Sequence, residues 1–288
     1  MRKVERFAML IGIIVATWIV KFVADFPTAD ISVIGVILSI ASILFGLLAG
    51  FFFSEQWTRY TEIRSLQSER SSAGLMLITA AKHFFSNEKF KKDFTERMER
   101  TAVADECINW DEGDFEEPYY YETLKSFELI NVDNQKDAQY FSAMLGYNHT
   151  YAMNTVKLDV LYQERLSIIE WLLFFFLTAI IVVSVLLLDV SHMLYSIIVL
   201  TFPGVIFLTL SIIYDLNTLN WGRNLITLEP NQVIFDALGV QRFYMKRNVK
   251  YIPHGLTQYR TEDTLQGVAL STYQNILLLE DKRHKSGG

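Results

Sequence analysis

The sequence of 288 residues has a single cysteine, only five scattered histidines and none of the common catalytic motifs. Cys107 alone cannot form a disulfide within the chain, so we expect a reduced thiol. The histidines are too scattered along the sequence to indicate a metal site. Because no phosphate loop, nucleophile elbow or paired-histidine motif occurs, the chain is expected to be no enzyme and to hold no cofactor.

Charge is missing from the longest apolar runs: none lies between Ile31 and Phe53, or between Trp171 and Leu188. A charge at the bilayer centre would cost at least ~2.5 kcal/mol on insertion scales. Four stretches come close to the ~20 apolar residues that a helix needs to cross a bilayer. They are residues 7–23, 31–53, 168–188 and 193–214. The sequence therefore predicts an all-α membrane protein with four transmembrane helices, set as two hairpins.

The first stretch has a second interpretation, because a basic start followed by apolar residues is also typical of a signal peptide. No small-x-small cleavage site follows it, so we expect this helix to be retained. Basic residues precede the first helix and follow the second and fourth, whereas residues 189–192 have no Lys or Arg. The positive-inside rule therefore predicts that both termini and the block between helices 2 and 3 are cytoplasmic.

The predicted spans divide the chain into four parts. These are transmembrane helices 1 and 2 (1–53), a cytoplasmic helical domain (54–166), transmembrane helices 3 and 4 (167–214), and a cytoplasmic C-terminal segment and tail (215–288). Residues 54–165 hold 13 Lys and Arg against 20 Asp and Glu. This acidic balance argues against nucleic acid as a partner, because nucleic-acid-binding surfaces are basic.

The cytoplasmic block is predicted to be helical almost throughout. Residues 54–85 have no proline and only Gly74, so the second membrane helix should continue beyond the membrane, with Gly74 as the place for a bend. A helix over 89–103 carries an apolar stripe that favours packing within the protein over binding a partner. The stripe is Phe90, Phe94, Met98 and Ala102. Further helices are predicted over 119–131 and 133–166, the second running unbroken into the third span.

Residues 105–122 form the most acidic segment, with eight Asp or Glu. Acidic clusters can bind calcium, but this spacing does not match an EF-hand loop, so a solvated acidic turn is the favoured interpretation. After the fourth span, a turn over 215–222 should precede a helix that starts at Glu229-Pro230 and ends near Leu238.

Beyond that helix, four basic residues alternate with aromatic ones, a pattern that fits contact with anionic lipid heads or an ordinary solvated face equally well. They are Arg242, Lys246, Arg247 and Lys250. Residues 253–288 are predicted to be a loosely ordered tail.

The second membrane helix carries two distinct faces. One consists only of small residues, which favours close packing of helices in lipid and, as an alternative, could line a narrow aqueous path. This small face is Ser32, Gly35, Ser39, Ser42, Gly46 and Ala49. The bulky face, roughly 100° around the helix, is Ile43, Leu47 and Phe51. It would point to a symmetry axis, where apolar rings gate by dewetting, or face lipid.

The end of this helix resembles the pore helix of the bestrophin family of ion channels. The resemblance rests on Gly50-Phe51-Phe52-Phe53, then on Trp57, Arg59 and Tyr60. Two further stretches resemble bacterial bestrophin-like proteins: residues 68–74 (Ser-Glu-Arg-Ser-Ser-Ala-Gly) and residues 221–230 (Trp-Gly-Arg-Asn-Leu-Ile-Thr-Leu-Glu-Pro). These motifs are short, and together with the four helices they cover about half of the chain.

The resemblance implies a pentameric ion channel in the bacterial inner (cell) membrane, with Ile43, Leu47 and Phe51 as the pore neck. Its partners would be the lipid bilayer, copies of itself and inorganic ions. The calcium clasp of some bestrophins is not expected, because residues 221–230 contain only one acidic residue, Glu229. Ion selectivity stays open, although the acidic balance weighs against anions. The alternative is a non-conducting membrane scaffold or signalling adaptor that acts through its cytoplasmic helical domain.

Overall fold

The computed structural model describes residues 11–17, 19–21, 31–84, 87–107, 122–188, 193–219, 225–253 and 255–286. Over these ranges the regular structure is helical, with no strand and one isolated bridge, between Phe243 and Arg260. The all-α class predicted from the sequence is confirmed.

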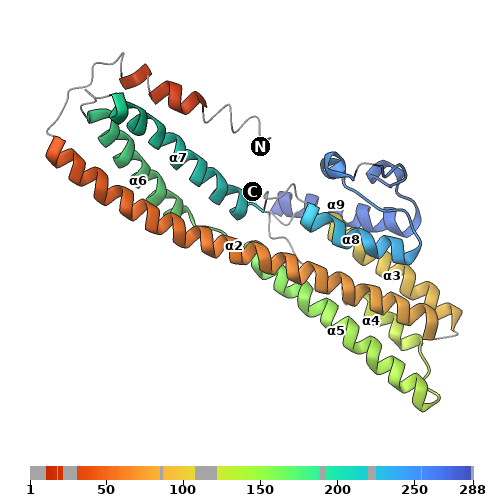
Figure 1. The fold of residues 1–288 in the computed structure, drawn as a ribbon. Helices are drawn as coiled ribbons and strands as arrows, with labels where there is room; N and C mark the ends of the chain where they lie inside the picture. Colours follow the sequence, from red (N-terminus) through yellow and green to blue (C-terminus); the bar gives the residue numbers. More distant parts are fainter. Residues whose placement is uncertain are drawn as a thin grey trace. The chain divides into compact units, whose positions relative to one another are not determined.

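The α-helices after residue 30 are drawn in Figure 1. They are α2 (Ile31–Phe84), α3 (Glu88–Cys107), α4 (Glu122–Ser126), α5 (Gln135–Gln163), α6 (Ile168–Leu187), α7 (Met193–Asn217), α8 (Leu225–Leu238) and α9 (Gly267–Ser286). Short 3-10 helices lie at Phe127–Leu129, Lys246–Tyr251 and Glu262–Thr264.

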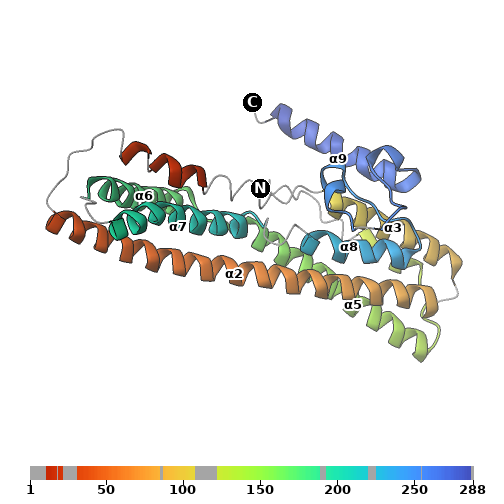
Figure 2. The same ribbon diagram turned by 45° about the horizontal axis from the view of Figure 1, so that its top comes forward.

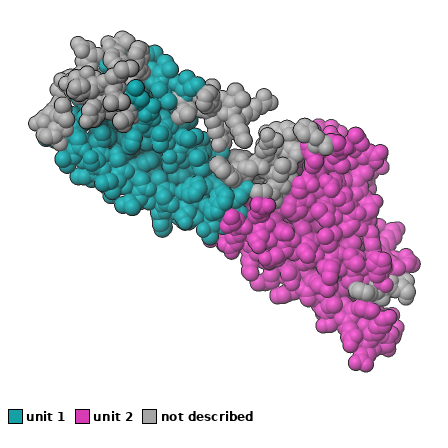
Figure 3. All heavy atoms as spheres, viewed as in Figure 1, with its two compact units in different colours: residues 1–60, 165–221 teal, residues 61–164, 222–288 magenta. Residues whose placement is uncertain are grey.

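The chain forms two compact units (Figure 3). Unit 1 consists of residues 1–60 and 165–221, and unit 2 of residues 61–164 and 222–288. Helix α2 contributes its first part to unit 1 and its second part to unit 2, as an unbroken helix of 54 residues. The predicted continuation of the second apolar stretch as one helix is confirmed.

In unit 1, α6 and α7 run side by side along the first part of α2 (Figure 1 and Figure 2). Phe174 of α6 is the centre of this packing, with its ring 5.8 Å from that of Phe45 and 5.4 Å from that of Phe52. The far end of α6 is capped by Lys21, which donates to the carbonyls of Leu186 and Leu188. A cation there is favourable because carbonyl dipoles make a helix C-terminus negative.

Two helical stretches, Val33–His83 and Gln135–Leu187, are long and apolar enough to cross a membrane. Only 22% and 28% of their most apolar windows are buried inside the chain. The apolar side chains therefore face outward rather than into a core of the chain's own, and exposed apolar surface of this extent marks an interaction with lipid or protein. Thr201–Asn217, which is part of α7, and Ile11–Lys21 are shorter apolar stretches.

Unit 2 is built around α3, which packs against α4, α8 and α9. The predicted stripe on α3 lies at the centre of the core, and each of its four side chains is at most 1% exposed. The interpretation that it packs within the protein is confirmed. Asn87 starts the helix, because its side-chain oxygen accepts from the backbone N–H of Lys89 and Phe90, both at 3.1 Å.

Gly74 of α2 lies where three other helices approach closely. A Cβ at this position would come within 3.2–3.4 Å of side-chain atoms of Met98, Tyr151 and Ile234. The absence of a side chain therefore lets α3, α5 and α8 pack against α2 at one level, and the helix passes through Gly74 without interruption.

The predicted unbroken helix from residue 133 into the third apolar stretch is wrong. α5 ends at Gln163 and α6 starts at Ile168. The backbone N–H of Leu166 donates to the side chain of Asn217 at 2.8 Å, so it makes a tertiary contact instead of a helical one. Ser167 and Glu170 then form a capping box, which starts a new helix.

Three other element predictions need correction. The helix expected over 119–131 is only α4 and one 3-10 turn over the described residues from 122 onward. α8 begins at Leu225 rather than at Glu229, with Pro230 inside it rather than at its start. The predicted loose tail contains α9, which packs on α3 through Ala269, Thr272 and Ile276.

Replacing Gly74 by leucine should destabilise unit 2 by ~1–3 kcal/mol, because a large side chain cannot enter the filled space. Gly146 is the matched control, since it lies in α5 with nothing within 4 Å of a Cβ. Gly146→Leu should change stability by less than ~1 kcal/mol, in the stabilising direction. Chemical unfolding of the purified variants tests both values, and equal effects at the two glycines would contradict the packing described.

Candidate functional site

The first part of α2 has one side that packs inside the chain. Its buried side chains are Ile34, Ala41, Phe45, Ala49 and Phe52, each at most 7% exposed. All of these except Ile34 belong to a cluster with residues of α6 and α7 that include Phe174, Ile181 and Ile213. The spacing of 3, 4 or 7 residues keeps this row on one side of a helix that advances 100° per residue.

The predicted bulky face points away from that packing. Ile43, Leu47 and Phe51 are 63%, 68% and 64% exposed, and steps of four residues hold them in a single row. The structure therefore brings the three predicted neck residues together on one face. Over the described residues, no other helix of the chain covers them.

The predicted small face lies between the packed side and the bulky face. Gly35 and Gly46 have nothing within 4 Å of a Cβ. Ser39 is exposed, and its hydroxyl donates to the carbonyl of Gly35 at 2.7 Å. Ser42 is half-buried, Ala49 belongs to the packed side, and the side chain of Ser32 is outside the described residues. At Gly35 and Gly46 the small face is therefore open within this chain.

Aromatic side chains gather at the end of the apolar part of α2. The ring of Trp57 stacks with Phe53 at 6.3 Å and with Tyr60 at 5.9 Å. In the same unit, the ring of Trp171 at the start of α6 lies 6.2 Å from that of Tyr214 near the end of α7. Trp and Tyr at the ends of apolar helices are typical of a membrane–water boundary.

Arg59 ties these three helix ends together. It is buried, and its Nη1 donates to Oε1 of Gln56 and to the backbone carbonyl of Asn217, both at 3.0 Å. Asn217 also accepts from the N–H of Leu166 through its side chain. Arg59, one of the basic residues that follow the second apolar stretch, therefore links α2 to the end of α7, and Asn217 extends the link to the residues before α6.

A second polar cluster lies in unit 2 and was not predicted. Arg70 of α2 is fully buried, 3.3 Å from Oδ2 of Asp105 on α3, and it donates to Asn231 on α8. The hydroxyl of Tyr151 on α5 donates to the same Asp105 oxygen at 3.0 Å. Four helices thus contribute to one buried ion pair, and its members are too far apart in sequence for a motif to reveal them.

The predicted acidic turn is wrong for its first two residues. Asp105 and Glu106 belong to α3 and are 5% and 3% exposed. At the other end, Glu122 is in α4 and pairs with Arg97 at 2.9 Å. Residues 108–121 are outside the described residues. In the parts of the chain that the structure describes, no three His, Cys, Asp or Glu side chains converge to hold a metal ion.

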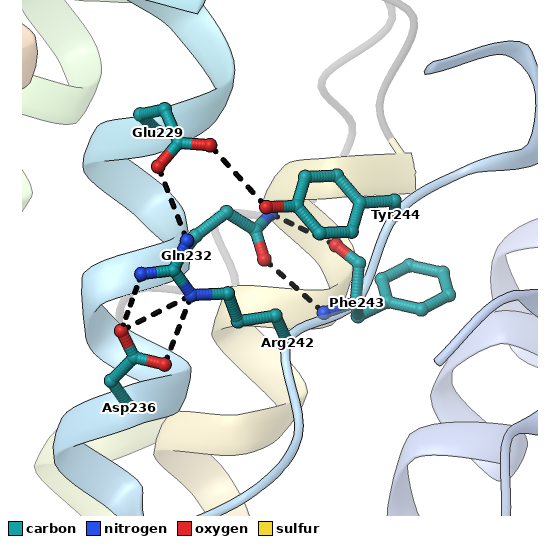
Figure 4. A network of polar contacts seen from close by, with 6 residues as sticks. All are labelled: Glu229, Gln232, Asp236, Arg242, Phe243 and Tyr244. Carbon is teal, nitrogen blue, oxygen red and sulfur yellow. Dashed lines mark hydrogen bonds and ion pairs between the residues drawn. The ribbon is translucent and has the colours of Figure 1, made fainter. Parts of the chain in front are cut away.

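The basic residues proposed to contact lipid heads are partly engaged by the chain itself (Figure 4). Arg242 lies 2.7 Å from a carboxylate oxygen of Asp236 and 3.2 Å from one of Glu229. Lys246 pairs with Asp263 at 2.8 Å. Arg247 donates to the carbonyl of Cys107 at 3.2 Å. The Lys250 side chain is outside the described residues. Phe243 and Tyr244, which lie between these basic residues in the sequence, are fully buried. The alternation of basic and aromatic residues therefore reflects the packing of a folded segment.

Comparisons of the chain with protein-family models, with curated proteins and with solved structures find no match. The candidate site therefore rests on the sequence and on the geometry described above.

The two sides of α2 should respond differently to truncation. Phe45→Ala should lower stability by about 2 kcal/mol or more, because it leaves a cavity against Phe174. Leu47→Ala removes a side chain that the chain itself does not pack, so the folded subunit should lose much less. Thermal unfolding in detergent measures both, and a loss at Leu47 equal to that at Phe45 would show that the bulky face is packed inside the subunit.

Proposed function

We propose that this chain is one subunit of an oligomeric, bestrophin-like ion channel whose pore lies on the symmetry axis and is lined by α2. The row of Ile43, Leu47 and Phe51 is the observation that carries the proposal. Three bulky apolar side chains stand exposed in the apolar part of a helix whose opposite side is fully packed. A ring of such rows would form a neck that gates by dewetting.

The three sides of α2 supply the geometry for such a ring. The packed side holds α6 and α7 of the same subunit. The open space at Gly35 and Gly46 would receive a helix of the neighbouring subunit, because small residues let helix backbones approach closely in lipid. The bulky face, roughly 100° further around, is then left for the axis. One subunit encloses too little space for a pore, so closed symmetry is required, and the resemblance to bestrophins implies a pentamer.

In the membrane, we infer four spans over residues 7–23, 31–53, 168–188 and 193–214. The aromatic residues around Trp57 and Trp171 would lie at one boundary. Unit 2 and both termini would be cytoplasmic, because the basic residues flank the spans on that side. The membrane would be the bacterial inner membrane, and the permeant species an inorganic ion whose sign is open.

A non-conducting scaffold or adaptor is the second candidate. The observation in its favour is that unit 2 has a hydrophobic core of its own, formed by α3 with parts of α2, α5, α8 and α9. On this alternative, Ile43, Leu47 and Phe51 face lipid, and the protein is a monomer or dimer.

Ion flux into liposomes with the purified oligomer tests the channel. Wild-type protein should carry flux, and Phe51→Ala should raise it several-fold, because a smaller ring weakens the dewetting barrier. Phe176→Ala is the matched control, since Phe176 of α6 is 66% exposed in the subunit but outside the proposed neck. It should leave the flux unchanged.

The mass of the detergent-solubilised protein separates the two candidates. A closed ring is expected for the channel. A monomer or dimer, or a well-folded ring that carries no flux, would contradict the proposed function. Equal effects of Phe51→Ala and Phe176→Ala on the ion flux would show that α2 does not line the pore.

A further inference from the structure

The last turn of α3 carries two acidic residues into the interior of unit 2. Asp105 and Glu106 are 5% and 3% exposed, and Arg70, on the neighbouring α2, is 0% exposed. One buried positive charge thus faces two buried carboxyl groups. If all three were ionised, the interior would hold an uncompensated negative charge, which is costly in a medium of low polarity.

The contacts of Arg70 show which carboxyl group it neutralises. Arg70 lies 3.3 Å from Asp105, and its other terminal nitrogen donates to Asn231. The hydroxyl of Tyr151 gives Asp105 a further hydrogen bond at 3.0 Å, and the guanidinium lies over the Tyr151 ring, 5.7 Å from its centre. Burial raises the pKa of Asp105, and the nearby Arg70 charge and the Tyr151 hydrogen bond oppose that rise, so Asp105 has two partners that favour its charged form.

Glu106 has no comparable partner. Both of its carboxyl oxygens are buried, and over the described residues neither accepts a hydrogen bond of full geometry; the Asn231 and Gln232 amides on α8 give it only a weak interaction. Gln232 is engaged at both ends by the backbone of Phe243, at 2.9 and 3.2 Å, and the oxygen of Asn231 accepts from Arg70, so the Asn231 NH2 group is the main donor left for Glu106. A carboxyl group in this position is tolerated as the neutral acid.

We propose that Glu106 is a proton-binding site, and that its proton keeps the last turn of α3 packed against α2 and α8. When the proton is lost, the charged carboxylate requires water, and the turn opens to reach it. The proposal does not depend on whether the protein conducts ions, because every group in it belongs to unit 2.

The charges around Glu106 come from several elements. Arg70 on α2 is positive, and Asp105 on α3 pairs with it, although burial raises the pKa of Asp105. Tyr151 on α5 is neutral, since burial raises the pKa of its hydroxyl further above its usual value. On α8 the facing groups, Asn231 and Gln232, are uncharged. Arg247 holds the end of the turn by donating to the carbonyl of Cys107 at 3.2 Å.

Burial raises the pKa of Glu106 to about 8, with Asp105 adding to the rise and the Asn231 amide and Arg70 opposing it. The usual value, near 4.5, applies to the unfolded chain. Between these two values the folded state binds more protons than the unfolded state, so stability falls as the pH rises through this window. The stabilisation that protonated Glu106 gives the folded state is fully present below about pH 4.5 and is lost above about pH 8.

Cys107, the next residue and the only cysteine of the chain, is a buried reporter for this turn. We would measure the rate of thiol labelling in the full-length protein in detergent between pH 6 and pH 9.5. Dividing by the rate for the urea-unfolded chain at each pH removes the titration of the thiol itself. The normalised rate should rise at least about fivefold between pH 7 and pH 9, because each unit above the pKa favours the deprotonated form tenfold.

Glu106→Gln keeps the shape and removes the titration, so its normalised rate should stay flat. Glu128→Gln, the same change at an exposed position, should keep the wild-type profile. A flat profile in the wild-type protein would overturn the proposal without reference to any variant. So would an unchanged rise in Glu106→Gln that shows wild-type helicity by circular dichroism.

Discussion

The structure depends on the continuity of α2, whose 54 residues form one uninterrupted ladder of backbone hydrogen bonds. Its first part supplies Phe45 and Phe52 to the packing of unit 1, and its second part supplies Leu77 and Ile78 to the core of unit 2. Within unit 2, α4, α8 and α9 also pack on α3.

Polar contacts hold the apolar helices in place at their ends, where hydrophobic burial discriminates poorly between registers. Arg59 links α2 to the carbonyl end of α7, Asn217 reaches the backbone before α6, and Lys21 caps the other end of α6. Each of these bonds satisfies a backbone group that a helix terminus or a break leaves without a partner. The apolar middle of each helix supplies packing area, and the polar contacts at its ends fix its position along the helix axis.

The sequence predicted the parts of the fold that depend on local pattern. Apolar runs located α2, α6 and α7, and the four-residue spacing of Phe90, Phe94 and Met98 identified a buried face correctly. The row of Ile43, Leu47 and Phe51 could likewise be predicted as a row, but not its exposure, which depends on where α6 and α7 pack. Arg70 and Asn231 are separated by 161 residues, so nothing local indicated their contact. α9 was missed because two of its buried residues, Ala269 and Thr272, are small or polar, and Ile276 alone does not form an evident stripe.

The segment around Phe243 illustrates how a helical protein can hold an extended chain. The Gln232 side chain takes both the N–H and the carbonyl of Phe243, as a neighbouring strand would. On the other side, the Arg260 backbone accepts from Tyr244 and donates to the carbonyl of Arg242. A lone extended segment normally presents open hydrogen-bonding groups to which other chains can add, with aggregation as the result. Here the side chain of Gln232 on α8 occupies the hydrogen-bonding groups on that edge. The segment is therefore bonded on both sides, as a central strand is, although no sheet surrounds it.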